Sequence, residues 1–90
     1  MPTVNFTQAL KRFYPGLKPM EIGGDTVAEV VEGVNANFPG IKDYLVDEQG
    51  RLRKHVNIFV GEKLIRDKLA LSDAVDPHDE VFIMQALSGG

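Results

Sequence analysis

The segment from Thr26 to Phe38 constrains the fold more than any other part of the sequence. Its apolar residues recur at the period of an α-helix with one buried face. These residues are Val27, Val30, Val31, Val34 and Phe38. Thr26 and Glu29 have the spacing of a capping box, in which the hydroxyl accepts the Glu29 amide and the Glu29 carboxylate reaches back to the cap. Because valine is a mediocre helix former, we expect this helix to be held by packing against a sheet.

Several short segments around this helix have the pattern of β-strands. Each combines alternating polarity with β-branched or aromatic residues, which favours extended structure. The expected strands are residues 3–7, 17–22, 52–60, 64–65 and 81–86. Turn sequences separate them: Tyr-Pro-Gly at 14–16 favours a hairpin between the first two, and Asp-Pro-His-Asp at 76–79 favours a turn before the last. Residues 40–47 are expected to form a short turn or a distorted helical piece.

The resulting order, ββαβββ, predicts an α+β domain with the β-grasp fold of ubiquitin-like proteins. We expect a mixed sheet of about five strands, with one main helix on one face and the other face open. The predicted domain covers residues 1–86, and residues 87–90 form a flexible Gly-Gly tail.

Composition narrows the classes of function. Ninety residues with 43% hydrophobic and 26% charged content suit one folded domain. The net charge of −3 argues against a nucleic-acid partner, which needs a concentration of Lys and Arg. The absence of cysteine excludes disulfides, thiolate metal sites and cysteine nucleophiles. No apolar window approaches a membrane-spanning length and Met1 to Leu10 has no secretory pattern, so we expect a cytoplasmic protein without a membrane partner.

The most informative candidate site is the C-terminal sequence Leu87-Ser88-Gly89-Gly90. Glycine has no Cβ, so such an end can enter a narrow channel and expose its carbonyl carbon to attack. A carboxylate is a poor electrophile and must first be converted to an acyl-adenylate. The sequence has no phosphate-binding loop, Ser-His-Asp arrangement or metal-ligand cluster for this step. We therefore predict a carrier that other enzymes act on, with no metal or bound cofactor of its own; the alternative is that the two glycines are an expression remnant.

Three segments resemble the family of ubiquitin-like sulfur carriers. They are Val56-Asn57-Ile58-Phe59-Val60-Gly61, Asp79-Glu80-Val81-Phe82-Ile83 and the final Gly89-Gly90. The family groups the small subunit of molybdopterin synthase, the thiamine-pathway carrier and a cysteine-biosynthesis carrier. The Asn-Ile-Phe-Val strand together with the Gly-Gly end is most similar to the cysteine branch. Gln85 departs from the family pattern, which commonly has a proline shortly after the last strand.

The resemblance implies a cycle of activation and sulfur transfer at Gly90. An E1-like adenylating enzyme would use ATP and magnesium to adenylate Gly90, and sulfur would then replace AMP to give a thiocarboxylate. The implied sulfur acceptor is a cysteine synthase or the large subunit of molybdopterin synthase, and a metalloprotease would release the product. Two alternatives stay open: a ubiquitin-like modifier conjugated through Gly90 to lysines, and a non-catalytic interaction module.

Alternation along the strands predicts a surface for such partners. If the buried positions of the last strand face the helix, Phe82 and Met84 point to the open face, where Phe59 can join them. An exposed apolar patch of this kind often marks an interface. The alternative is partial burial of the patch under the loop from 64 to 75.

A short basic cluster and two histidines complete the candidates. Arg53, together with Arg51 and Lys54, is expected either to attract acidic partners or to protect a strand edge from aggregation. His55 and His78 have no second histidine or cysteine at ligand spacing. We therefore interpret them as a strand-surface residue and a turn residue.

Overall fold

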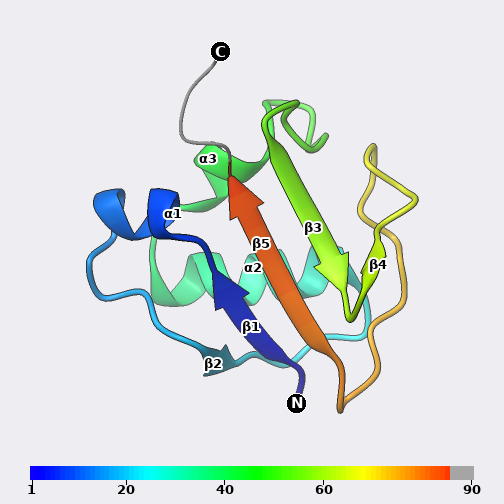
Figure 1. Ribbon diagram of the computed structural model, residues 1–90. Helices are drawn as coiled ribbons and strands as arrows, with labels where there is room; N and C mark the ends of the chain where they lie inside the picture. Colours follow the sequence, from blue (N-terminus) through cyan, green and yellow to red (C-terminus); the bar gives the residue numbers. More distant parts are fainter. Residues whose placement is uncertain (86–90) are drawn as a thin grey trace.

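A mixed five-stranded sheet forms one layer of the structure, and the long helix α2 crosses one face of it (Figure 1). The computed structural model describes residues 1–85. Its strands are β1 (Thr3–Phe6), β2 (Met20–Glu21), β3 (Val56–Val60), β4 (Lys63–Leu64) and β5 (Glu80–Gln85). Its helices are α1 (Gln8–Phe13), α2 (Val27–Asn37) and α3 (Lys42–Leu45). The strand order is β2-β1-β5-β3-β4; β1 and β5 are parallel and all other neighbours are antiparallel. The predicted α+β class is confirmed.

Helix α2 begins with the predicted cap. The Glu29 amide donates to the Thr26 hydroxyl at 3.3 Å. The Glu29 carboxylate accepts the amide of Asp25 at 3.0 Å, one residue before the position that a standard capping box uses. The valines of the predicted stripe are all buried at the sheet; they are Val27, Val30, Val31 and Val34. Packing of this stripe therefore holds the helix, as the sequence predicts.

The loop between β4 and β5 packs against the start of α2. The amides of Val27 and Ala28 donate to the carbonyl groups of Asp73 and Leu71, at 3.0 Å and 2.9 Å. These bonds satisfy amides of the first helical turn, which have no partner inside the helix. The part of the loop around Leu71 and Asp73 therefore lies at the start of α2, on the helix side of the sheet, which argues against the alternative that the loop covers the open face.

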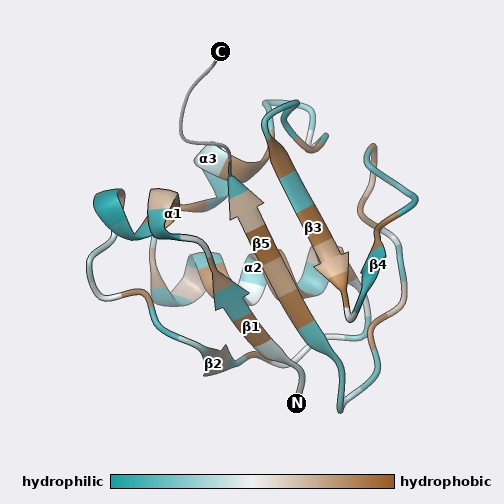
Figure 2. Ribbon diagram, viewed as in Figure 1, coloured by the Kyte–Doolittle hydropathy of each residue, from teal (hydrophilic) through white to brown (hydrophobic). Residues whose placement is uncertain are grey.

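The core lies between α2 and the helix-facing residues of the central strands. In β5, Val81 and Ile83 are fully buried, and Val4 of β1 and Ile58 of β3 are buried with them. Figure 2 shows the apolar residues concentrated along β5 and β3, the strands at the centre and beside it. Packing of α2 against the three central strands β1, β5 and β3 therefore stabilises the sheet.

The predicted hairpin between the first two strands is wrong in its details. The connection contains the six-residue helix α1, which the sequence analysis did not predict, and β2 is confined to Met20–Glu21. Only Ala9 and Leu10 of α1 are buried, which is too short a pattern to show a helical period. Pro19 has no amide to donate to the β1 ladder, so pairing with β1 starts only after it.

The long strand predicted over residues 52–60 begins four residues later, at Val56. Leu52 forms only an isolated bridge with Val46, and the Val56 amide donates to the Arg53 carbonyl in a turn. Arg53 and His55 therefore lie in a loop and not on a strand face. The smaller elements are closer to prediction: α3 occupies the expected helical piece, β4 is shifted by one residue, and the Asp79 amide closes the 76–79 turn on the Asp76 carbonyl at 3.0 Å.

Asp67 organises the loop between β4 and β5, and its pKa gives a testable pH dependence. Its carboxylate accepts the Ser72 hydroxyl and the amides of Leu69, Ala70 and Ser72. These donors, the hydroxyl first, lower the pKa of Asp67 from 3.8 to about 2. Because the pKa is lower in the folded chain, the carboxylate stabilises the fold above the unfolded value of 3.8, and this contribution is lost as the pH falls towards 2.

Replacing Ser72 with alanine should therefore raise the pKa of Asp67 towards its ordinary value. An NMR titration of the side-chain carboxyl carbon measures this directly, and Asp67→Asn identifies the resonance by removing it. The acid unfolding midpoint of Ser72→Ala should move to higher pH. A pKa unchanged by the substitution would show that the amides alone hold the carboxylate.

Candidate functional site

The predicted site at the C-terminus follows directly on the central strand. Residues 86–90 lie outside the described part of the chain, and these include the predicted tail Leu87, Ser88, Gly89 and the predicted attachment residue Gly90. The last described residue, Gln85, is held from two sides. It is paired with Val56 of β3, and its amide donates to the Thr7 hydroxyl at 3.3 Å. The base of the predicted tail is therefore part of the sheet.

The open face of the sheet carries the predicted apolar patch. Phe82 and Met84 alternate with the buried residues of β5, and Phe59 lies directly opposite Phe82 on β3. Met84 is 43% exposed, whereas the two phenylalanines are half-buried. Because Phe59 and Phe82 are cross-strand neighbours, their side chains lie on the same face of the sheet.

Leu64 also belongs to this patch, although the sequence did not predict it as a member. It is the register partner of Phe59 on β4 and is 42% exposed, as exposed as Met84. A two-residue strand is too short to show alternation, so no sequence signal assigned Leu64 to a face. We call the four residues Phe59, Leu64, Phe82 and Met84 the open-face patch.

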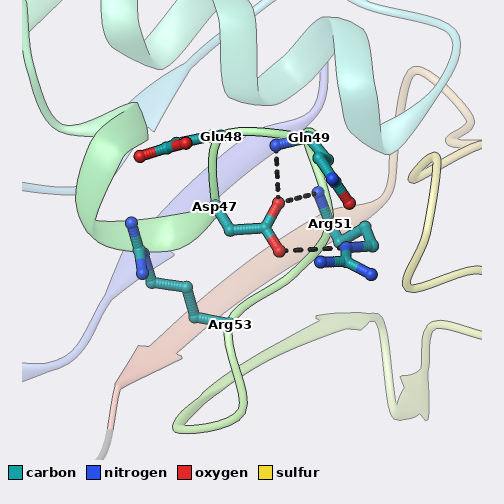
Figure 3. Close-up of a pocket in the computed structure, with 5 residues that line it drawn as sticks. All are labelled: Asp47, Glu48, Gln49, Arg51 and Arg53. Carbon is teal, nitrogen blue, oxygen red and sulfur yellow. Dashed lines mark hydrogen bonds and ion pairs between the residues drawn. The ribbon is translucent and has the colours of Figure 1, made fainter.

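Arg53 lies apart from the open-face patch, in the loop that precedes β3. Together with Asp47, Glu48, Gln49 and Arg51 it lines a shallow pocket of about 210 Å³ (Figure 3). Its Nε donates to the carbonyl of Asp43 in α3 at 3.0 Å. Because Val56 is paired with Gln85, this basic loop lies at the end of the sheet where β5 finishes.

The carboxylate in this pocket is satisfied locally. Figure 3 shows Asp47 accepting the amides of Gln49 and Arg51 and the Nε of Arg51, at 2.9 Å, 3.0 Å and 3.0 Å. The Arg51 amide is the main cause that lowers the pKa of Asp47 below 3.8. A carboxylate held ionised by its own loop serves to fix that loop, and it is a poor general acid.

Further candidates for chemistry are few in the described residues. His55 and His78 are both exposed, in separate loops at opposite ends of the sheet. Between residues 1 and 85, no group of three or more His, Cys, Asp or Glu side chains is placed to hold a metal ion. Within the same residues, no helix has the length and apolarity needed to cross a membrane.

Comparison with known proteins gives the family. Residues 8–90 match the ThiS family. The chain belongs to the ThiS family. The sulfur carrier protein CysO of Mycobacterium tuberculosis is 33% identical over 90 residues, which cover 98% of this chain and 97% of that protein.

Solved structures agree with this membership. A chain in the crystal structure of the BexX/CysO complex of Amycolatopsis orientalis is 31% identical, with a TM-score of 0.85 and full coverage of both chains. The crystal structure of Mycobacterium tuberculosis CysO is 32% identical, with a TM-score of 0.83, covering 96% of this chain and 99% of that chain. The β-grasp fold predicted from the sequence is thereby confirmed.

Proposed function

We propose that this protein is a sulfur carrier and that the carboxyl group of Gly90 is converted to a thiocarboxylate by partner enzymes. Two observations together carry the proposal: the chain belongs to the ThiS family, and its sequence has Gly-Gly four residues after the last described residue of the central strand β5. A relative that is 33% identical over nearly its whole length is named a sulfur carrier protein. We assign the chain no catalytic residue of its own; it is the substrate of the enzymes that act on Gly90.

The chemistry proceeds by activation and displacement. A carboxylate oxygen of Gly90 attacks the α-phosphorus of ATP, and pyrophosphate leaves to give an acyl-adenylate. A sulfur nucleophile then attacks the carbonyl carbon and AMP leaves, so that one oxygen of the carboxylate is replaced by sulfur. The adenylating enzyme supplies the ATP and magnesium sites. The carrier supplies a glycine, whose lack of a side chain leaves the carbonyl carbon accessible.

Cysteine biosynthesis is the pathway that the comparisons favour. Two of the similar proteins bear the name CysO, and one of them was crystallised in a complex with BexX. We therefore propose a cysteine synthase as the sulfur acceptor, in preference to the large subunit of molybdopterin synthase. A metalloprotease that releases the product and a cytoplasmic location belong to the same proposal.

The decisive experiment is an intact-mass measurement. The protein is incubated with the adenylating enzyme of its own organism, ATP, magnesium and sulfide, and a reaction without ATP is the control. Replacement of one oxygen by sulfur supports the carrier function. An unchanged mass, with an enzyme shown to be active on another carrier, would contradict it. A conjugate with lysine side chains, found after adding cell extract, would favour a ubiquitin-like modifier instead.

The open-face patch gives a prediction about docking of the adenylating enzyme. Replacing Met84 with aspartate places a charge in the exposed part of the patch, and we expect the KM for the carrier to rise about tenfold, since one well-placed interface contact is worth over ~1 kcal/mol. Steady-state pyrophosphate release measures KM and kcat, and kcat should not change.

The matched control is Leu69→Asp. Leu69 is 69% exposed, but it belongs to a pocket that α2 lines, on the other side of the sheet. This variant should keep the wild-type KM. Equal increases in KM for both variants would show that the open-face patch is not the docking surface.

A further inference from the structure

The last described amide of β5 is bonded to a side chain and not to the backbone. β1 and β5 run parallel, and the Thr7 amide donates to the Ile83 carbonyl at 3.3 Å. The next bond of a parallel ladder would join the Gln85 amide to the Thr7 carbonyl. The Gln85 amide instead donates to the Thr7 hydroxyl at 3.3 Å. The hydroxyl thus replaces the carbonyl in the ladder.

The Thr7 carbonyl is occupied because α1 starts at this residue. Thr7 is the N-cap of α1, and its carbonyl accepts the Lys11 amide at 3.4 Å. A threonine at the N-cap commonly uses its hydroxyl to accept an amide of its own helix. Thr7 makes no such bond. Its carbonyl serves the helix, and its hydroxyl is left for β5.

The Gln85 amide has no partner on the other side of its strand. Successive residues of a strand direct their amide and carbonyl groups to opposite neighbours. Since the Ile83 carbonyl is bonded to β1, the amide of Gln85, two residues on, also points to β1 and away from Val56 of β3. Removal of the hydroxyl would leave this amide without a bond in the ladder.

We propose that Thr7 is a positioning residue for the reaction at Gly90. Its hydroxyl ends the β1–β5 ladder at Gln85 and so fixes the point and the direction from which residues 86–90 start. This inference rests on the proposed function, because the starting point matters only if a partner enzyme must reach the Gly90 carboxyl. Without the bond, Gln85 is no longer held by β1, and the point from which residues 86–90 start can take a wider range of positions. A wider range of positions lowers the rate of the chemical step.

The test compares Thr7→Val, which keeps the shape but removes the hydroxyl, with Thr7→Ser, which keeps the hydroxyl. Hydrogen exchange followed by NMR should show the Gln85 amide exchanging about fivefold faster in Thr7→Val, the factor expected for one hydrogen bond. In the adenylation assay, kcat should fall about fivefold and KM should stay constant, because the open-face patch is untouched. Thr7→Ser should restore both the exchange rate and kcat.

Several outcomes would overturn the inference. Unchanged exchange in Thr7→Val would show that the bond is absent in solution. Faster exchange with unchanged kcat, a change confined to KM, or failure of Thr7→Ser to restore kcat would each remove the positioning role. If the wild-type protein is not adenylated at all, the proposed function fails and the role of Thr7 fails with it. In that case the exchange rates would still show whether the bond exists.

Discussion

Deletion of Gly90 should abolish formation of the thiocarboxylate. The deletion withdraws the carboxyl group by one residue, about 3.5 Å of extended chain, from the position where ATP is attacked. A misplacement of about 1 Å can lower a rate about 100-fold, so we expect the adenylation rate to fall by at least about 1,000-fold. Pyrophosphate release and intact mass measure the two steps separately.

Ser88→Ala is the matched control, because it changes a side chain near the end and keeps the length of the chain. It should be adenylated at close to the wild-type rate. The urea midpoint of the Gly90 deletion should also equal that of the wild type, as the predicted division into a domain and a tail requires. A deletion variant that still accepts sulfur at Gly89 would show that the partner enzymes do not measure the length of this segment.

Replacement of Ile83 with alanine should give the largest loss of stability, about 3–4 kcal/mol. Ile83 is fully buried, and it lies between Phe6 of β1 and Ile58 of β3 at the centre of the sheet. Small domains have about 5–15 kcal/mol of stability in total, so the variant should retain its fold with a much lower urea midpoint.

Met84→Ala is the control for this prediction. It lies on the same strand one residue later, but on the open face, and should lose less than about 1 kcal/mol. Urea denaturation followed by circular dichroism measures both free energies of unfolding. Equal losses at the two positions would contradict the assignment of the two faces of β5.

The features predicted correctly from the sequence are those that depend on residues close together in the chain. The helical stripe and the Thr26 cap of α2 are contained within a few turns of chain, and the faces of β5 follow from a period of two. These signals were sufficient for the fold class and for three members of the open-face patch. The candidate site at the Gly-Gly sequence stays a prediction, because residues 86–90 lie outside the described part of the chain.

The features that the sequence did not reveal depend on contacts between distant residues. The hydrogen bond between Thr7 and Gln85 joins residues 78 positions apart, and no periodic pattern in the sequence predicts it. The start of β3 was predicted four residues too early. Leu52 forms an isolated bridge with Val46, and the residues between Leu52 and Val56 are kept out of the strand. Helix α1 and strand β4 are too short for any period to be visible.

The parallel pairing of β1 with β5 also determines when the protein can fold during synthesis. Strand β1 cannot pair with β5 until β5 has been synthesised, and β5 occupies the centre of the sheet between β1 and β3. A chain that ends before Glu80 lacks β5, so β1 and β3 have no strand between them and the central sheet cannot form.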